Sequence, residues 1–277
     1  MKSTSSHPDR VITEQEWKHY EEEGYVKLGQ LLSDEELRAL QQRIDDIMLG
    51  KAPVDYDRMM MQLDSDSGKY EDAGQQSAGF KGATKNYRKI EQLEHDPLFL
   101  SYMQRPIFRD ICARVYGKET SISCFRAMFM NKPAHKGTWL PWHQDRWNFL
   151  DRDPLLTVYT GLDPATTANG CVLVIPRSHK LGVINPEHSS GFLVKEQAEK
   201  HCPKEKILPM ELKPGEVALL HNWLLHASDI NKTDASRRAF SVCYMDGRTR
   251  DTRNSQTFPV IFGENALSPE KLRLVAA

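Results

Sequence analysis

The sequence predicts a mainly β protein with flanking helices, its strands forming a sandwich or a barrel-like structure. Turn signals such as "NG" at 169–170 and "PG" at 214–215 separate short runs that are rich in β-branched and aromatic residues. The sequence has no Gly-rich phosphate loop and no internal repeat, which argues against a nucleotide-binding α/β fold. Many short strands of this kind are typical of sandwiches and barrels. The runs lie at 121–132, 155–163, 171–176, 205–213, 216–226 and 237–246.

Two helices are predicted near the start of the chain. Each follows a capping-box pattern, Thr13 with Glu16 and Ser33 with Glu36. The segment "GYVKLG" at 24–29 lies between them, and its bounding glycines and alternating apolar residues favour a short strand.

The region between these helices and the strand-rich part contains a predicted loop and two more helices. Residues 51–88 are polar, rich in Gly, Ser and Asp and weakly periodic, so we expect a long loop that acts as a lid. Residues 96–117 have helical spacing, and Pro106 splits them into two helices.

The length and composition predict one domain. The 277 residues, 39% of them hydrophobic, are enough to fill a single large core. We expect a disordered tail at 1–12 and a single domain at 13–277. Within this domain we expect a helical part at 13–118, a β core at 119–250 and a C-terminal tail at 251–277.

Charge and cysteine content indicate the kind of partner and compartment. With 37 basic and 38 acidic residues the net charge is -1, which favours a small-molecule substrate over nucleic acid or a membrane surface. The five cysteines are scattered and show no metal-binding spacing, as expected for reduced thiols. The polar start and the lack of a run of roughly 20 apolar residues predict a cytoplasmic protein. No heptads are visible, so we expect a monomer.

The stretch "WHQD" contains the first candidate for a functional site. Side chains on a strand alternate between two faces, so His143 and Asp145 point the same way if the stretch is extended and can bind one ion together. Taken alone the pair is weak evidence, because a surface ion pair or a buried, hydrogen-bonded histidine gives the same pattern.

A second stretch, "LLHNWLLHASD", supplies a third ligand, either His221 or His226. Two imidazoles and one carboxylate suit non-haem iron(II) and also catalytic zinc. Arg237 favours iron, because its guanidinium would clamp a dicarboxylate cosubstrate. Arg238 competes for this role, since only one of the two can face the interior. Ser228, two residues after His226, would add a hydroxyl donor.

The motifs "HQD", "NGC", "IPRSH", "PGE", "LLHASDINKT" and "SRRAFS" occur in an order and spacing that resemble a known family. This is the phytanoyl-CoA hydroxylase, or phytanoyl-CoA dioxygenase, family of Fe(II)- and 2-oxoglutarate-dependent oxygenases. The resemblance extends from "EEEGYVKLGQLLSDEEL" to about residue 250. It implies a double-stranded β-helix, which is a cupin-like jelly roll, with helices around it; residues 119–250 would form this jelly-roll core.

The resemblance also implies roles for individual residues. His143, Asp145 and His226 would bind the iron, and Arg237 would hold the C5 carboxylate of 2-oxoglutarate. Tyr159 stands where the family often has tryptophan, which leaves its role open. Further contacts to the cosubstrate would come from Lys89, Met128, Tyr159 and Ser228. A solvated loop charge at Lys89 and a core methionine at Met128 are the alternatives.

The expected reaction is hydroxylation of an unactivated C–H bond in a small organic metabolite or natural product. It would use O2 and convert 2-oxoglutarate to succinate and CO2. Related halogenases have a small residue where this chain has Asp145, so halogenation is not expected. The alternatives are a zinc hydrolase or isomerase on the same ligands and a small-molecule binder of the same fold without turnover.

Three loops, 51–88, 146–153 and 185–205, are expected to determine the substrate. No basic cluster clearly suited to a CoA diphosphate is visible, which favours a small free metabolite over a CoA ester. Candidate substrate contacts are Met61, Gln62, Arg126 and Trp147.

Overall fold

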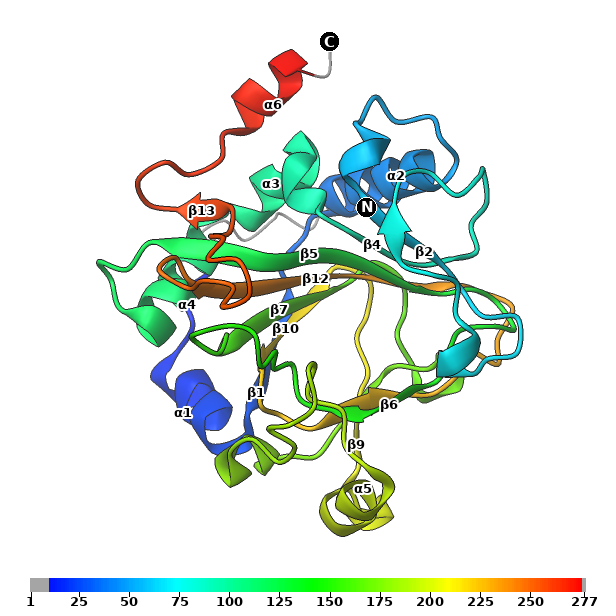
Figure 1. Cartoon of the computed structure of the whole chain (residues 1–277), viewed down its shortest axis with the longest axis vertical. Helices are drawn as coiled ribbons and strands as arrows, with labels where there is room; N and C mark the ends of the chain where they lie inside the picture. The colour runs from blue at the N-terminus through cyan, green and yellow to red at the C-terminus, as the bar shows by residue number, and fades with distance from the viewer. Residues whose placement is uncertain (1–9, 276–277) are drawn as a thin grey trace, which may run out of the picture.

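The computed structural model describes residues 10–275, and most of the predicted disordered tail, residues 1–9, lies outside the described part. Two β-sheets face each other, as Figure 1 shows, and confirm the predicted jelly roll. The larger sheet has nine strands in the order β1-β10-β7-β12-β5-β4-β2-β3, with β13 also paired to β5; the smaller has the order β6-β11-β8-β9. The strands are β1 (Tyr25–Gln30), β2 (Met60–Leu63), β3 (Ser77–Ala78), β4 (Tyr87–Glu91), β5 (Ile122–Lys132), β6 (Leu140–His143), β7 (Leu156–Gly161), β8 (Val172–Val174), β9 (Leu208–Met210), β10 (Glu216–His221), β11 (His226–Ser228), β12 (Arg237–Asp246) and β13 (Val260–Phe262).

The helices lie outside the two sheets. The predicted capping boxes are present at both early helices, with Thr13 and Ser33 each accepting from the backbone N–H three residues later. Residues 96–117 form two helices that divide before Pro106, as predicted. The described helices, none of which is long and apolar enough to cross a membrane, are α1 (Glu14–Glu23), α2 (Asp34–Met48), α3 (Pro97–Met103), α4 (Pro106–Tyr116), α5 (Lys195–His201) and α6 (Pro269–Val275).

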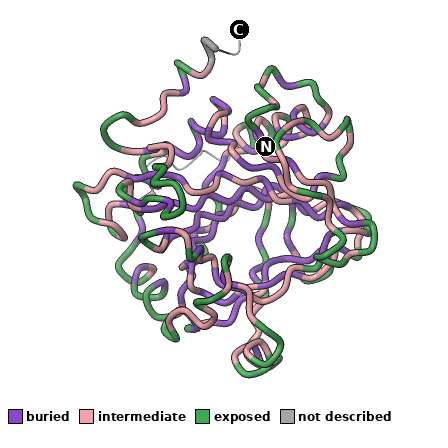
Figure 2. Tube along the Cα trace, in the orientation of Figure 1, coloured by how far each residue is buried: buried purple, intermediate pink, exposed green. Residues whose placement is uncertain are grey.

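The central strands of the larger sheet are buried on both faces. On β10, Val217 and Leu219 belong to the core that α2, α3 and α4 share with the outer face of the sheet. Ala218 and Leu220, which alternate with them, pack between the two sheets against the smaller one. Burial on both faces explains why this strand is a continuous apolar run in the sequence. Figure 2 shows buried chain, in purple, along the central strands of this layer.

The structure corrects the prediction of a loop at 51–88. β2 and β3 lie inside this segment, and β2 pairs with β4 so that it extends the larger sheet. Met61 of β2 is completely buried in the core. The three methionines at 59–61 are too few to show a period, and their pairing partner β4 lies about 30 residues away, so no strand could be recognised locally.

Two further expectations are refined. The run 216–226, predicted as one strand, divides at a turn into β10 of the larger sheet and β11 of the smaller one. The C-terminal segment 251–277 contains β13, which pairs with β5, and α6.

Candidate metal centre

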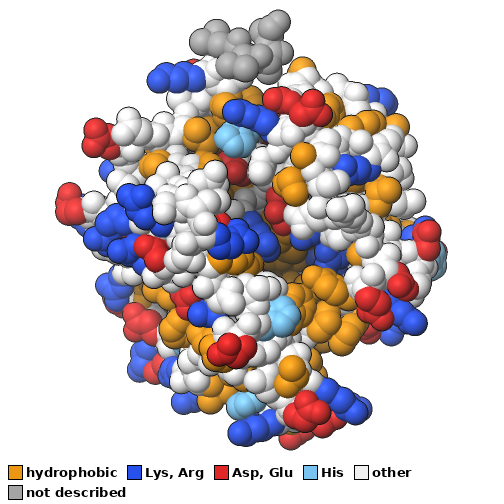
Figure 3. All heavy atoms as spheres, in the orientation of Figure 1, with side chains coloured by type: hydrophobic (Ala, Val, Ile, Leu, Met, Phe, Trp, Pro, Cys, Tyr) orange, Lys and Arg blue, Asp and Glu red, His pale blue; other side chains and the backbone are white. Residues whose placement is uncertain are grey.

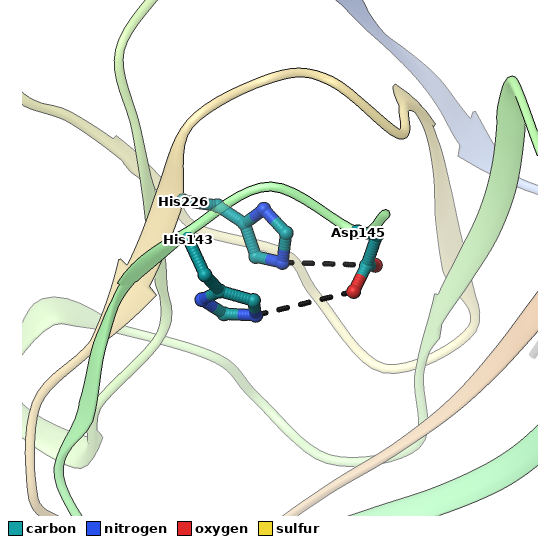
Figure 4. A group of neighbouring side chains, drawn as sticks. All are labelled: His143, Asp145 and His226. Atoms are coloured by element: carbon teal, nitrogen blue, oxygen red, sulfur yellow. Dashed lines mark ion pairs between the residues drawn. The ribbon is translucent and has the colours of Figure 1, made fainter. Parts of the chain in front are cut away.

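Neighbouring strands of the smaller sheet bring the three predicted ligands together. His143 of β6 and His226 of β11 are paired directly across the two antiparallel strands, and their ring centroids are 4.0 Å apart. Asp145 follows two residues after His143, just beyond the end of β6. Its carboxylate oxygens lie 3.9 Å from His143 Nε2 and 3.7 Å from His226 Nε2, the atoms that the dashed lines join in Figure 4.

Hydrogen bonds to the backbone fix the orientation of both imidazoles. His143 Nδ1 lies 2.8 Å from the carbonyl oxygen of Pro141, and His226 Nδ1 lies 2.9 Å from that of Leu224. An Nδ1–H that donates to a carbonyl leaves the Nε2 lone pair free, which is the usual arrangement of a metal-binding histidine. Burial, and then the neighbouring His226, hold the pKa of His143 well below its ordinary value of 6.5, so this imidazole is neutral at pH 7.

The donor set therefore fits a metal ion better than it fits a salt bridge. A neutral His143 forms no ion pair with Asp145, and the nitrogen–oxygen distances are too long for hydrogen bonds. Two ligand atoms that are each about 2.1 Å from one metal ion lie no more than about 4.2 Å apart, and both measured distances satisfy this limit. All three ligand atoms lie within 4.8 Å of one another.

The backbone on either side of Asp145 is held firmly. Gln144, which is completely buried, donates from Nε2 to the carbonyl oxygens of Gly182 and Trp223, both at 2.8 Å. The Asp145 N–H donates to the carbonyl oxygen of Asn222 at 2.7 Å. These bonds tie the ligand segment to the turn between β10 and β11 and so to the strand that carries His226.

His221, the alternative third ligand, lies elsewhere. Its ring is 5.0 Å from that of His179 and 5.7 Å from that of Trp223, and it is not part of the described His-Asp-His group. Burial, and then His179, lower the pKa of His221 from 6.5 to about 4. The structure thus places His226 with the other two ligands.

A cavity of about 260 Å³ between the sheets contains this centre. In the space-filling view of Figure 3, this face of the molecule is hollowed near its middle, with basic and apolar side chains around the hollow. Two predicted substrate contacts do not line the cavity: Met61 is in the core, and Gln62 bonds to Gly74 and Arg88. The predicted residues that do line it are His143, Asp145, His226, Arg237, Ser228, Lys89, Met128, Tyr159, Arg126 and Trp147.

Arg237 faces the cavity, and Arg238 faces away from it. Arg237 is 3% exposed and donates to the Tyr159 hydroxyl at 2.9 Å and to the Gly170 carbonyl at 2.8 Å. Its Nε has no hydrogen-bond partner in the described part of the chain, and no described carboxylate lies within 4.0 Å of the guanidinium. Arg238 instead pairs with Asp163 and Asp45 on the outer face. A buried arginine without a counter-charge is suited to an anionic ligand.

Gly170 is required for this arrangement. Its φ of +75° favours glycine, and a Cβ there would lie 2.3 Å from the Asp229 carbonyl oxygen. The "NG" turn signal in the sequence thus marks the residue whose carbonyl holds Arg237 in position.

Sequence reasoning missed several residues of the cavity wall. Arg88 and Phe192 line it, and the Phe192 ring stacks on His143 at 4.7 Å. Arg88 appears only as a charge beside Lys89 in the sequence, and no local signal separates the two. Phe192 lies within 185–205, a loop already expected to contact substrate.

The chain is similar in structure to proteins that bind iron. It matches the epimerase SnoN in complex with Fe3+, alpha ketoglutarate and nogalamycin RO with a TM-score of 0.66 and 14% identity, covering 91% of this chain and 96% of that one. It also matches the structure of EctD from S. alaskensis with bound Fe. The TM-score is 0.64 and the identity 22%, and the match covers 90% of this chain and 81% of that one. At these identities the likeness concerns the fold.

A family model described as phytanoyl-CoA dioxygenase matches residues 20–239. Together with the jelly roll and the His-Asp-His centre, this match defines the protein as an oxygenase of the iron- and 2-oxoglutarate-dependent class. The chain belongs to the phytanoyl-CoA dioxygenase family.

Two relatives show how far the sequence similarity extends. The chain is 26% identical over 248 residues to "Probable phytanoyl-CoA dioxygenase" of Caenorhabditis elegans, covering 84% of this chain and 75% of the relative. It is 26% identical over 270 residues to "Phytanoyl-CoA dioxygenase domain-containing protein 1" of Danio rerio, covering 85% of this chain and 91% of the relative.

Proposed function

We propose that the protein hydroxylates an unactivated C–H bond of a small organic metabolite or natural product, using Fe(II), 2-oxoglutarate and O2. The substrate, 2-oxoglutarate and O2 would yield the alcohol, succinate and CO2. The observation that carries the proposal is the presence, in one cavity, of a three-ligand metal centre and a buried arginine without a counter-charge.

Different side chains of the cavity would bind the metal and the cosubstrate. His143, Asp145 and His226 would hold the iron, which supplies the activation of dioxygen when bound. Arg237 would bind the far carboxylate of 2-oxoglutarate, with Tyr159 keeping the guanidinium in place. Lys89, Met128 and Ser228, also on the cavity wall, would make further contacts to the cosubstrate.

The remaining cavity wall would position the C–H bond and exclude water. Asp145 supplies a carboxylate ligand, which supports hydroxylation over halide binding and halogenation. The cavity is slightly smaller than the roughly 300–1,000 Å³ typical of sites for drug-sized ligands, which supports a small substrate. We take the protein to act as a monomer on this substrate.

The experiment is an assay of succinate formation from 2-oxoglutarate by the Fe(II)-loaded protein in air, with and without pooled metabolites. We expect iron-dependent succinate that a metabolite pool increases and that His143→Ala and Arg237→Ala both abolish. Absence of succinate with every pool, together with tight zinc retention and no binding of 2-oxoglutarate, would instead support a zinc enzyme on the same ligands.

A further inference from the structure

The cavity carries more positive charge than iron and 2-oxoglutarate account for. Among the described residues that line it, Asp145 is the one acidic residue, whereas five are basic: Arg88, Lys89, Arg126, Lys132 and Arg237. Glu91, next to the cavity, faces both Lys89 and Arg126, so one carboxylate is shared by two cations. Bound iron(II) and the 2-oxoglutarate dianion would cancel each other's charge and leave the excess in place.

The pKa values of two lysines in the cavity are lowered by burial and by the neighbouring positive charges. The pKa of Lys89 is lowered to about 8, chiefly by burial; Glu91 opposes this shift, and Arg126 and Arg88 contribute to it. Burial, followed by the charge of Arg237, puts the pKa of Lys132 well below its ordinary value. An anionic ligand would relieve this repulsion.

Arg126 and the Lys132–Arg237 pair lie at different positions along the β5–β12 ladder. Arg237 is paired with Lys132 at one end of the β5–β12 ladder, and Arg126 is opposite Cys243 six residues further along β5. At about 3.3 Å per residue, the Cα atoms of Arg126 and Lys132 are roughly 20 Å apart. Arg126 therefore belongs to a different part of the cavity from the cosubstrate anchor.

The metal centre is tied to the Arg126 end. The Asp145 N–H donates to the Asn222 carbonyl, and the Asn222 side chain donates to Cys243 Sγ at 3.2 Å. A cosubstrate that extends from the metal toward Arg237 thus points away from the Arg126 end of the ladder.

Arg126 and Trp147 together offer groups that suit a carboxylate. The Arg126 guanidinium lies 4.7 Å over the Trp147 ring, which holds the side chain in place. Trp147 is 3% exposed, and its Nε1 donor has no hydrogen-bond partner among residues 10–275. A buried donor of this kind needs an acceptor, and none comes from the described part of the chain.

We propose that the primary substrate is a small organic acid whose carboxylate binds at Arg126 and Trp147, in the part of the cavity away from Arg237. This inference rests on the proposed function, because it assigns Arg237 to 2-oxoglutarate.

The test is isothermal titration calorimetry under nitrogen, on protein that holds Fe(II) and saturating 2-oxoglutarate. The probes are straight-chain monocarboxylates of four to ten carbons, their primary amides and the phosphate monoesters of the corresponding alcohols. We expect carboxylates to bind and the amides to bind roughly 10- to 100-fold more weakly, the range for a charge-assisted hydrogen bond. Arg126→Gln should weaken carboxylate binding by the same factor and leave 2-oxoglutarate binding unchanged.

Two variants serve as controls. Arg126→Lys should keep part of the carboxylate affinity because it keeps the charge, and Arg109→Gln, on the exposed face of α4, should change nothing. Equal binding of amides and carboxylates, wild-type carboxylate affinity in Arg126→Gln, binding of the phosphate monoesters alone, or no probe binding at all would overturn the inference. Failure of 2-oxoglutarate itself to bind the Fe(II)-loaded protein would instead count against the proposed function.

Discussion

Replacing Arg237 with Gln should remove most of the stabilisation of the protein by 2-oxoglutarate while changing the stability of the cosubstrate-free fold by no more than about 1 kcal/mol. The guanidinium is 3% exposed and has no described counter-charge, so its loss removes an unfavourable buried charge together with two hydrogen bonds. In the cosubstrate-free protein these two effects oppose each other.

The size of the effect follows from ligand linkage. At a 2-oxoglutarate concentration of about 100 times Kd, the wild-type protein gains about 2.7 kcal/mol, or roughly 5 °C in melting temperature. Truncating one partner of a buried charge pair costs about 2–5 kcal/mol, which is at least a 30-fold loss of affinity. At the same concentration the variant should gain about 0.9 kcal/mol or less.

The assay is thermal unfolding of the Fe(II)-loaded protein under nitrogen, with and without 2-oxoglutarate. Arg238→Gln is the matched control, because Arg238 pairs with Asp45 and Asp163 outside the cavity. It should lower the stability of the cosubstrate-free protein and keep the full shift with 2-oxoglutarate. A full shift in Arg237→Gln would refute the assignment of Arg237 as the anchor.

Two further predictions concern pH and metal binding. Burial raises the pKa of Glu94 from 4.5 to about 7, so the folded state holds this proton more tightly than the unfolded state and stability is lost as the pH rises from 4.5 through 7. Glu94→Gln should therefore raise the free energy of unfolding by about 3 kcal/mol at pH 8 and hardly at pH 4.5, measured by urea denaturation; an equal change at both pH values would contradict this. His226→Ala should reduce the bound Fe(II) from one equivalent to nearly none in equilibrium dialysis, whereas His221→Ala should retain it; the reverse result would make His221 the ligand.

The local sequence was sufficient to predict those features of the fold and the site whose physical cause acts over a few residues. The two capping boxes depend on contacts three residues apart, and the strand-rich runs record burial on both faces of the larger sheet. The strand period of two placed His143 and Asp145 on one side and predicted that Arg237 and Arg238 would face opposite ways. For this reason the core of the site could be predicted before the fold was known.

Tertiary structure decided what depends on pairing between distant segments. His226 takes its place with the other ligands because β11 pairs with β6, whereas His221 ends β10 in the other sheet. β2 forms because β4 offers it a sheet edge, and β3 then pairs with β2. A short methionine cluster does not predict this pairing.

The sequence by itself determined the fold class and a short set of chemically capable residues, because side-chain period and capping act over a few residues. Only the tertiary structure decided which of these residues share one cavity. Arg126, Lys132 and Arg237 come from β5 and β12, more than 100 residues apart in the chain, and the overall net charge of -1 conceals their excess in the cavity. Electrostatic interaction depends on distance through space, which strand pairing sets and a linear sequence does not record.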